Sequence, residues 1–125
     1  MQSERRFDHE KLEVYAVALE FVTWLTDLLT EVSQANKPNV RETVNQVDRA
    51  STSIVLNIAE GNGRRGTKQR AKFFDDARGS ATESAACLDV LVAKRVVKEI
   101  QVQHGKHLLN RITSMLSKLV ERFEK

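Results

Sequence analysis

The sequence predicts an all-α fold, an antiparallel four-helix bundle that forms a single domain over residues 1–125. The chain is long enough for one domain with one buried core. It contains only one proline and five glycines, which favours long helices over strands and turns. Four stretches carry apolar residues at helical spacing, and the breaks between them are short. Short connections join helices that run in opposite directions.

The first helix is expected to begin at Asp8, which can cap the free amides of its first turn while Phe7 and Leu12 form a hydrophobic staple. Its apolar face is unusually broad, with Trp24 off one edge. Either this helix is central in the bundle, or its edges meet another subunit. Because a large apolar patch in water is a liability, the sequence favours an oligomer.

The second helix follows a break around Pro38, and Asn39 with Glu42 resembles a capping box at its start. It is expected to run to about Glu60. One stripe of this helix is polar although apolar residues flank it, and it holds Arg49, Ser53, Asn57 and Glu60. This stripe is either a buried network that fixes how the helices register, or a half-exposed flank. We assign Arg78 and Glu83 of the third helix to the same network.

A glycine-rich basic turn joins the second and third helices. Gly61 and Gly63 are expected to end one helix in the left-handed conformation, and Thr67 to cap the next. The turn holds five cations and no acid: Arg64, Arg65, Lys68, Arg70 and Lys72. These residues form either a surface that binds nucleic-acid phosphates or a solubilising cap on a turn. The net charge of +3 is too small to decide between them.

The third helix, from about Lys68 to Arg95, carries a second face of short side chains opposite its large apolar one. Gly79, Thr82 and Ala86 lie on this face and let another backbone approach closely. Together with Trp24 they are the predicted oligomer contacts. The fourth helix, from about Lys98 to Glu124, has a one-sided apolar stripe and is expected to be peripheral.

Catalytic chemistry finds little support in the sequence. No Glu-x-x-His pattern occurs, which argues against a di-iron bundle, and His104 with His107 lacks a further metal ligand. Glu60 and Glu83 are the one candidate carboxylate pair, but nothing supplies a substrate pocket beside them. We therefore expect no enzymatic activity, no cofactor and no metal site.

The single cysteine, Cys87, allows no intramolecular disulfide and fits a reducing compartment. No apolar run of about 18 residues occurs, and the start lacks an apolar signal segment. We expect a cytoplasmic protein without a membrane partner.

A set of spaced residues resembles a known family signature. It comprises Ser53-Ile54, Asn57-Ile58-Ala59-Glu60-Gly61, Gly63-Arg64, Phe73, Ala77-Arg78-Gly79-Ser80 and Glu83, and Phe7, Leu12, Val14 and Tyr15 add a similar amino-terminal pattern. The likeness is to the bacterial four-helix-bundle proteins called intervening-sequence proteins, named for members encoded in insertions within large-subunit ribosomal RNA genes. It implies a helical bundle, commonly a homopentameric ring, without established catalytic activity. Accessory proteins of diversity-generating retroelements, which bind reverse transcriptase and nucleic acid, are more distantly similar.

Two function hypotheses follow. In the first, the protein is an RNA-binding or ribonucleoprotein accessory factor, and ring symmetry gathers its basic turns around one end. Its partners are then further copies of itself and RNA or a nucleic-acid-processing protein. In the alternative, it is a protein interaction scaffold without a nucleic-acid role, and the small-residue face and Trp24 are its working surfaces.

Overall fold

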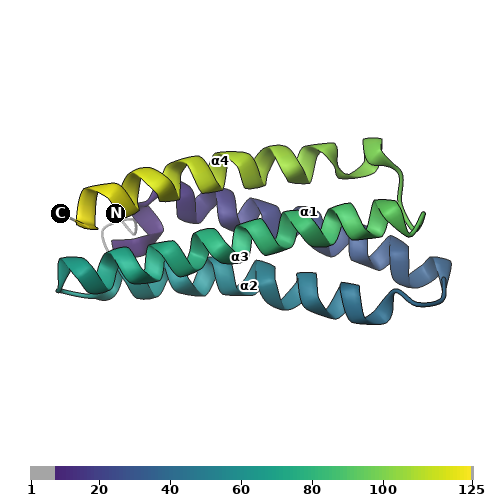
Figure 1. Cartoon of the computed structure of the whole chain (residues 1–125), viewed down its shortest axis with the longest axis horizontal. Helices are drawn as coiled ribbons and strands as arrows, with labels where there is room; N and C mark the ends of the chain where they lie inside the picture. The colour runs from purple at the N-terminus through teal and green to yellow at the C-terminus, as the bar shows by residue number, and fades with distance from the viewer. Residues whose placement is uncertain (1–7, 125) are drawn as a thin grey trace, which may run out of the picture.

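The computed structural model describes residues 8–124, which fold as one bundle of four α-helices preceded by a short 3-10 helix (Figure 1). The elements are η2 (Asp8–Lys11), α1 (Glu13–Ala35), α2 (Arg41–Gly63), α3 (Thr67–Ala93) and α4 (Glu99–Glu124). The described residues contain no strand, so the prediction of an all-α fold with four helices is confirmed.

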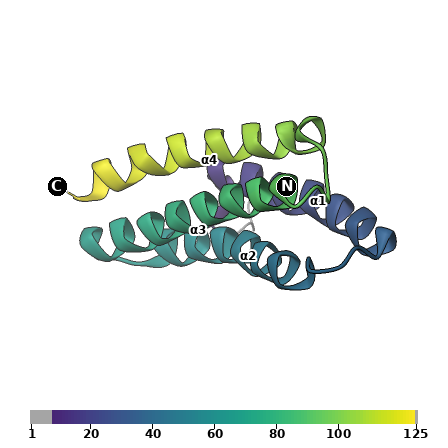
Figure 2. The same ribbon diagram turned by 45° about the vertical axis from the view of Figure 1, so that its right-hand side comes forward.

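The helices alternate in direction along the chain, so the bundle has two ends with different connections. One end holds the α2–α3 turn and the end of α4, and the other holds the α1–α2 and α3–α4 loops (Figure 1). In Figure 2, α3 runs between α2 and α4, and it packs against both of them. α1 closes the bundle by packing against α2 and α4.

A continuous apolar core runs through the bundle. Its largest fully buried side chains come from all four helices and include Phe21, Leu25, Ile54, Phe74, Leu88 and Ile112. Burying one such side chain contributes about 1.5–3 kcal/mol, and this burial drives the assembly of the helices. No helix within residues 8–124 is both long and apolar enough to cross a membrane.

The start of the first helix differs from the prediction. α1 begins at Glu13, after Leu12 adopts an extended conformation (φ −79°, ψ 130°), and no side chain caps it. Asp8 lies in the separate 3-10 helix, where its Oδ2 accepts a hydrogen bond from Nδ2 of Asn62 at 3.4 Å. The predicted cap is therefore wrong, and Phe7, the other half of the predicted staple, lies outside the described residues.

The start of the second helix also lacks the predicted cap. α2 begins at Arg41 behind Val40, which makes no side-chain capping bond. Asn39 precedes Val40 and has a positive φ of 63°, so it belongs to the loop. The predicted capping box between Asn39 and Glu42 is wrong because the helix starts one residue too late for it.

The glycines around the α2–α3 turn do not adopt the left-handed conformation that was predicted for Gly61 and Gly63. None of the described glycines has a positive φ, and Arg64, the residue after α2, is extended (φ −84°, ψ 145°). Thr67 is the first residue of α3, and its predicted role as the cap is also wrong, because Gly66 precedes the helix there without a side-chain bond.

Gly61 allows α2 and α3 to approach closely. A Cβ atom at this position would lie 3.1 Å from Cβ of Phe73 and 3.1 Å from the ring of Phe74. The absence of a side chain therefore lets the start of α3 pack directly against the end of α2.

Candidate nucleic-acid interface

The five predicted cations lie at the end of the bundle that carries the α2–α3 turn. We call Arg64, Arg65, Lys68, Arg70 and Lys72 the basic turn. The segment enters α3 at Thr67, so the last three of these residues project from the first turns of a helix. The structure thus brings the five residues to one end, beside the last turns of α4 (Figure 1).

Two cations of the basic turn flank one aromatic ring. The guanidinium carbon of Arg64 lies 4.9 Å from the centroid of the Phe73 ring, and Nζ of Lys72 lies 5.5 Å from the same centroid. Each also has a carboxylate partner four residues away, since Arg64 pairs with Glu60 and Lys72 pairs with Asp76 at 3.0 Å. Such exposed pairs contribute about 0–1 kcal/mol, so they partly neutralise the two charges without strongly fixing them.

Arg70 connects the turn to the end of α4. Its guanidinium carbon lies 4.4 Å from the centroid of the Phe123 ring, and Nη2 donates a hydrogen bond to Oδ1 of Asn62 at 3.1 Å. Arg122 covers the same ring at 5.3 Å. Arg70 therefore positions the turn against α4. Its guanidinium already contacts the Phe123 ring and the Asn62 side chain.

Arg65 and Lys68 differ from the other three cations. Both side chains are exposed, and neither forms an ion pair or hydrogen bond with any residue in the part of the chain that the structure describes. They carry the positive charge of the basic turn that is free for an external anion.

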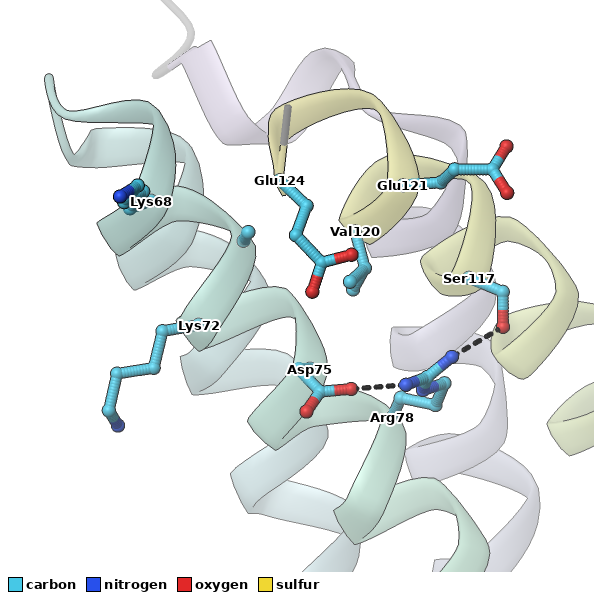
Figure 3. A pocket seen from close by; sticks show the side chains of 9 residues that line it. Lys68, Lys72, Asp75, Arg78, Ser117, Val120, Glu121 and Glu124 are labelled. Carbon is cyan, nitrogen blue, oxygen red and sulfur yellow. Dashed lines mark hydrogen bonds and ion pairs between the residues drawn. The ribbon is translucent and has the colours of Figure 1, made fainter.

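A groove between α3 and α4 extends from the basic turn (Figure 3). It is lined by Lys68, Ala71, Lys72, Asp75, Arg78, Ser117, Val120, Glu121 and Glu124. Figure 3 shows Glu124 pointing into the groove and Lys72 pointing away from α4. Because acids and bases share its walls, the groove is not a uniform anion site, and the free positive charge lies at the turn itself.

Arg78 spans this groove. Its Nη1 donates a hydrogen bond to Oγ of Ser117 in α4 at 3.0 Å, and its Nη2 contacts the carboxylate of Asp75. Arg78 thus links α3 to α4 and does not join the α2 residues of the predicted network.

The predicted polar network reduces to a smaller link between α2 and α3. Oγ of Ser80 donates to Oγ of Ser53 at 2.9 Å. Nδ2 of Asn57 donates to the carbonyl oxygen of Ser53 at 2.9 Å and to its Oγ at 3.0 Å, and Oγ of Ser84 donates to the carbonyl oxygen of Ser80. Ser80 and Ser84 were missed as network residues, although their spacing of four residues on a helix was visible.

Three further residues assigned to the network lie outside this link. Glu60 pairs with Arg64, while Arg49 and Glu83 are exposed. The link therefore crosses between the helices through the hydroxyl groups of Ser53 and Ser80, on the half-buried seam where α2 packs against α3.

The predicted oligomer contacts fall into two groups. Gly79, Thr82 and Ala86 are all exposed on α3, and a Cβ atom at Gly79 would meet nothing within 4 Å. Trp24 instead packs inside the chain, where its ring stacks on Phe21 with centroids 5.7 Å apart. Only the α3 group forms an open surface of short side chains.

The groups that could support catalysis or metal binding are scattered. Within residues 8–124, no three His, Cys, Asp or Glu side chains gather as metal ligands would. Burial, and then the carboxylate of Glu83, raise the pKa of the Cys87 thiol above its ordinary value. This thiol therefore stays protonated at neutral pH and is a poor nucleophile.

Comparison with known proteins identifies the family. A family model described as 23S rRNA-intervening sequence protein matches residues 10–118. The chain belongs to this family. The match covers α1, α2, α3 and most of α4, and it confirms the resemblance that the sequence motifs indicated.

A solved structure shows the same fold as this intervening-sequence protein. It is the crystal structure of a protein of unknown function from the S23 ribosomal protein family of Bacteroides thetaiotaomicron. The two chains are 21% identical and superpose with a TM-score of 0.78, over 86% of this chain and 97% of the other. No curated protein matches the sequence.

Proposed function

We propose that this intervening-sequence protein is a non-catalytic RNA-binding protein that contacts the phosphate backbone through its basic turn. The observation that carries the proposal is the exposure of Arg65 and Lys68 without any partner among residues 8–124. The family description, which refers to 23S ribosomal RNA, supports RNA as the polyanion and a cytoplasmic site of action.

The aromatic rings at this end favour backbone contact over base stacking. Phe73 lies beneath Arg64 and Lys72, and Phe123 lies beneath Arg70 and Arg122. A base could stack on either ring only by displacing a cation. Binding is therefore expected to depend strongly on salt and weakly on RNA sequence.

The test is a charge reversal of the two free cations, Arg65→Glu with Lys68→Glu. A matched control, Arg49→Glu with Lys118→Glu, reverses two exposed cations on the sides of the bundle. Both variants change the net charge from +3 to −1. Affinity for a labelled single-stranded RNA is measured by fluorescence anisotropy across a salt series.

Affinity falls as salt rises, and each phosphate contact adds about 0.7 to the steepness of log affinity against log salt. The turn variant loses two contacts, so its plot should be less steep by about 1.4. The control variant should keep the slope of the parent protein. Equal behaviour of the two variants would contradict the proposal, because net charge and not the turn would then govern binding.

We also propose that the protein works as a homopentamer assembled through the open face of α3. Gly79, Thr82 and Ala86 share this face with Val90, whose side chain is 40% exposed. On α2, Leu56 is 61% exposed, which adds unpartnered apolar surface to the chain. Such surface favours contact with another protein.

Solution mass from light scattering tests the assembly, and Ala86→Arg should lower that mass by placing a long cation on the contact face. A monomeric parent protein would contradict the pentamer. If the mass is that of a pentamer but the parent protein does not bind RNA, the observations favour a protein interaction scaffold.

A further inference from the structure

The end of the bundle opposite the basic turn holds a second group of cations. It comprises Lys37 and Arg41 around the α1–α2 loop, and Lys94, Arg95 and Lys98 in the α3–α4 loop, and we call these five residues the distal cations. Both loops lie at this end in Figure 1. None of the five makes an ion pair with a carboxylate among residues 8–124, whereas two cations of the basic turn do.

Two lysines hold the two loops together. Nζ of Lys94 donates to the backbone carbonyl of Asn39 at 2.8 Å, and Nζ of Lys37 donates to the backbone carbonyl of Arg95 at 3.4 Å. The bonds run in opposite directions between the loops, so each loop positions the other. This end is therefore a defined surface assembled from segments more than fifty residues apart in the chain.

The other three distal cations have no such structural role. The side chains of Arg41, Arg95 and Lys98 are exposed, and within residues 8–124 they make no hydrogen bond or ion pair. They are available to an external anion. Glu42 and Glu99, the acids nearest in sequence, lie in the first turns of α2 and α4, where they complement the helix dipoles.

Arg95 has a backbone conformation that its side chain does not favour. Its φ is 62°, a left-handed conformation just after the end of α3 that glycine adopts at lower steric cost. Asn36 and Asn39 are the other non-glycine residues with positive φ between residues 8 and 124, and both lie in the facing loop. The described non-glycine residues with positive φ are thus confined to this surface, and Arg95 is the one among them that is not asparagine, which points to a use for its side chain beyond folding.

A polar recess lies beside these cations, at the loop that joins α1 and α2. Its polar lining consists of Ser33, Asn36, Lys37, Asn39, Arg41 and Asn45. Amide and hydroxyl groups beside cations suit phosphate oxygens and ribose hydroxyls, which accept and donate hydrogen bonds.

We propose that the distal cations form a second RNA-backbone binding surface, so that one bundle contacts RNA at both ends. The choice of RNA as the polyanion rests on the proposed function, whereas the surface itself does not depend on the basic turn. The amide-lined recess favours RNA over the other large polyanion, an anionic membrane. Ile100 is 68% exposed near Lys98, so membrane binding is included as an outcome of the test.

The experiment compares Arg95→Glu with Lys98→Glu against the parent protein and against Arg49→Glu with Lys118→Glu, which changes the net charge equally. Binding of a short single-stranded RNA is measured at about 50 and about 200 mM salt. Raising the salt over this range weakens RNA binding by both proteins. Because the distal variant makes two fewer phosphate contacts, the factor by which its affinity falls should be about seven times smaller than the factor for the parent protein. The control should respond to salt as the parent does.

The outcomes separate this proposal from the proposed function. A salt response that changes on reversal at the basic turn, but not at the distal cations, overturns the second surface and leaves the first. The converse overturns the basic turn as an RNA site and leaves the second surface. A distal variant that keeps RNA binding but loses binding to phosphatidylserine-containing vesicles overturns the proposal in favour of a membrane.

Arg95→Gly separates binding from folding. It removes the charge and relieves the left-handed backbone, so the variant should melt at a higher temperature than the parent protein while its affinity for RNA at low salt falls. Arg95→Lys keeps the charge and should keep the affinity. An Arg95→Gly variant that is more stable and binds RNA as tightly as the parent overturns the proposal.

Discussion

The contact between Gly105 of α4 and Trp24 of α1 gives the sharpest stability prediction. A Cβ atom at Gly105 would lie 2.2 Å from Cζ3 and 2.3 Å from Cη2 of the indole ring, so an alanine there must displace the ring. The ring is also stacked on buried Phe21, which limits its movement. Overpacking of this kind costs about 1–3 kcal/mol.

The gain in helix propensity from glycine to alanine offsets about 1 kcal/mol of that cost. Because the 2.2 Å approach is far inside contact distance, we take the upper part of the overpacking range, about 2–3 kcal/mol. Gly105→Ala should then lower the free energy of unfolding by about 1–2 kcal/mol net. For a chain of this length, this corresponds to a fall in melting temperature of about 3–10 °C. Circular dichroism during thermal and urea denaturation measures both quantities, at one fixed protein concentration because assembly would shift them.

Gly63→Ala is the matched control, since Gly63 also lies in a helix, has open space around it and stands outside the proposed contact face. This variant should keep or slightly raise the free energy of unfolding. The clashing atoms belong to the six-membered part of the Trp24 indole. Trp24→Phe removes them and should make Gly105→Ala less costly in a double-mutant cycle. A Gly105→Ala protein at least as stable as the parent would refute this account of the α1–α4 contact.

Other predictions concern the α2–α3 seam and the buried thiol. Ser80→Ala should lower the free energy of unfolding by about 1 kcal/mol, because it removes the side-chain bond to Ser53. Asn57→Leu should change it less, since the bonds of Asn57 stay within its own helix; a larger loss, or a changed solution mass, would restore the network interpretation. The raised pKa of Cys87 favours the protonated thiol in the folded state, so its contribution to stability should fall as pH rises past the ordinary thiol range. Glu83→Gln should lower that pKa and speed alkylation of Cys87 at mildly alkaline pH.

The sequence predicted the helices well because their apolar spacing is a local property of the chain. The end of α4 at Glu124 was predicted correctly, and α3 ends close to the predicted residue. Helix starts were predicted less well, because Asp8 and Asn39 are good capping residues whose use depends on where the backbone turns. The extended backbone of Leu12 and the positive φ of Asn39 place these residues outside the helices that they were expected to cap.

Features that require two helices to be placed side by side were only partly predictable. The helical wheel selected Ser53 and Asn57, but the partner Ser80 depends on the register between α2 and α3. Likewise, the sequence places Gly105 at helical spacing with the apolar residues of the fourth helix, but the reason for a glycine there is the Trp24 ring from another helix. Short side chains at such positions reveal a close approach only when the opposing group is known.

The distal cations were missed because no local window of sequence contains them. Lys37 and Arg95 are 58 residues apart, and neither loop alone is as basic as the α2–α3 turn. The signal that could have found them is topological: in a bundle whose helices alternate in direction, the first and third connections share an end. Charge counted by bundle end, and not by sequence window, would have placed these five cations together.

Unpaired cations lie at both ends of the bundle, so the length of the bundle sets the distance between the two proposed RNA-binding surfaces. α4 has 26 residues, so the two surfaces are separated by about 39 Å at a rise of 1.5 Å per residue. In a ring whose axis runs along the helices, symmetry would place every basic turn on one face and every distal surface on the other. Such a ring would hold two RNA segments apart and parallel to its faces. A long RNA with two separated binding segments should then bind more tightly than either segment alone, and reversal at either end should remove that advantage while leaving the binding of a single short segment at the other end.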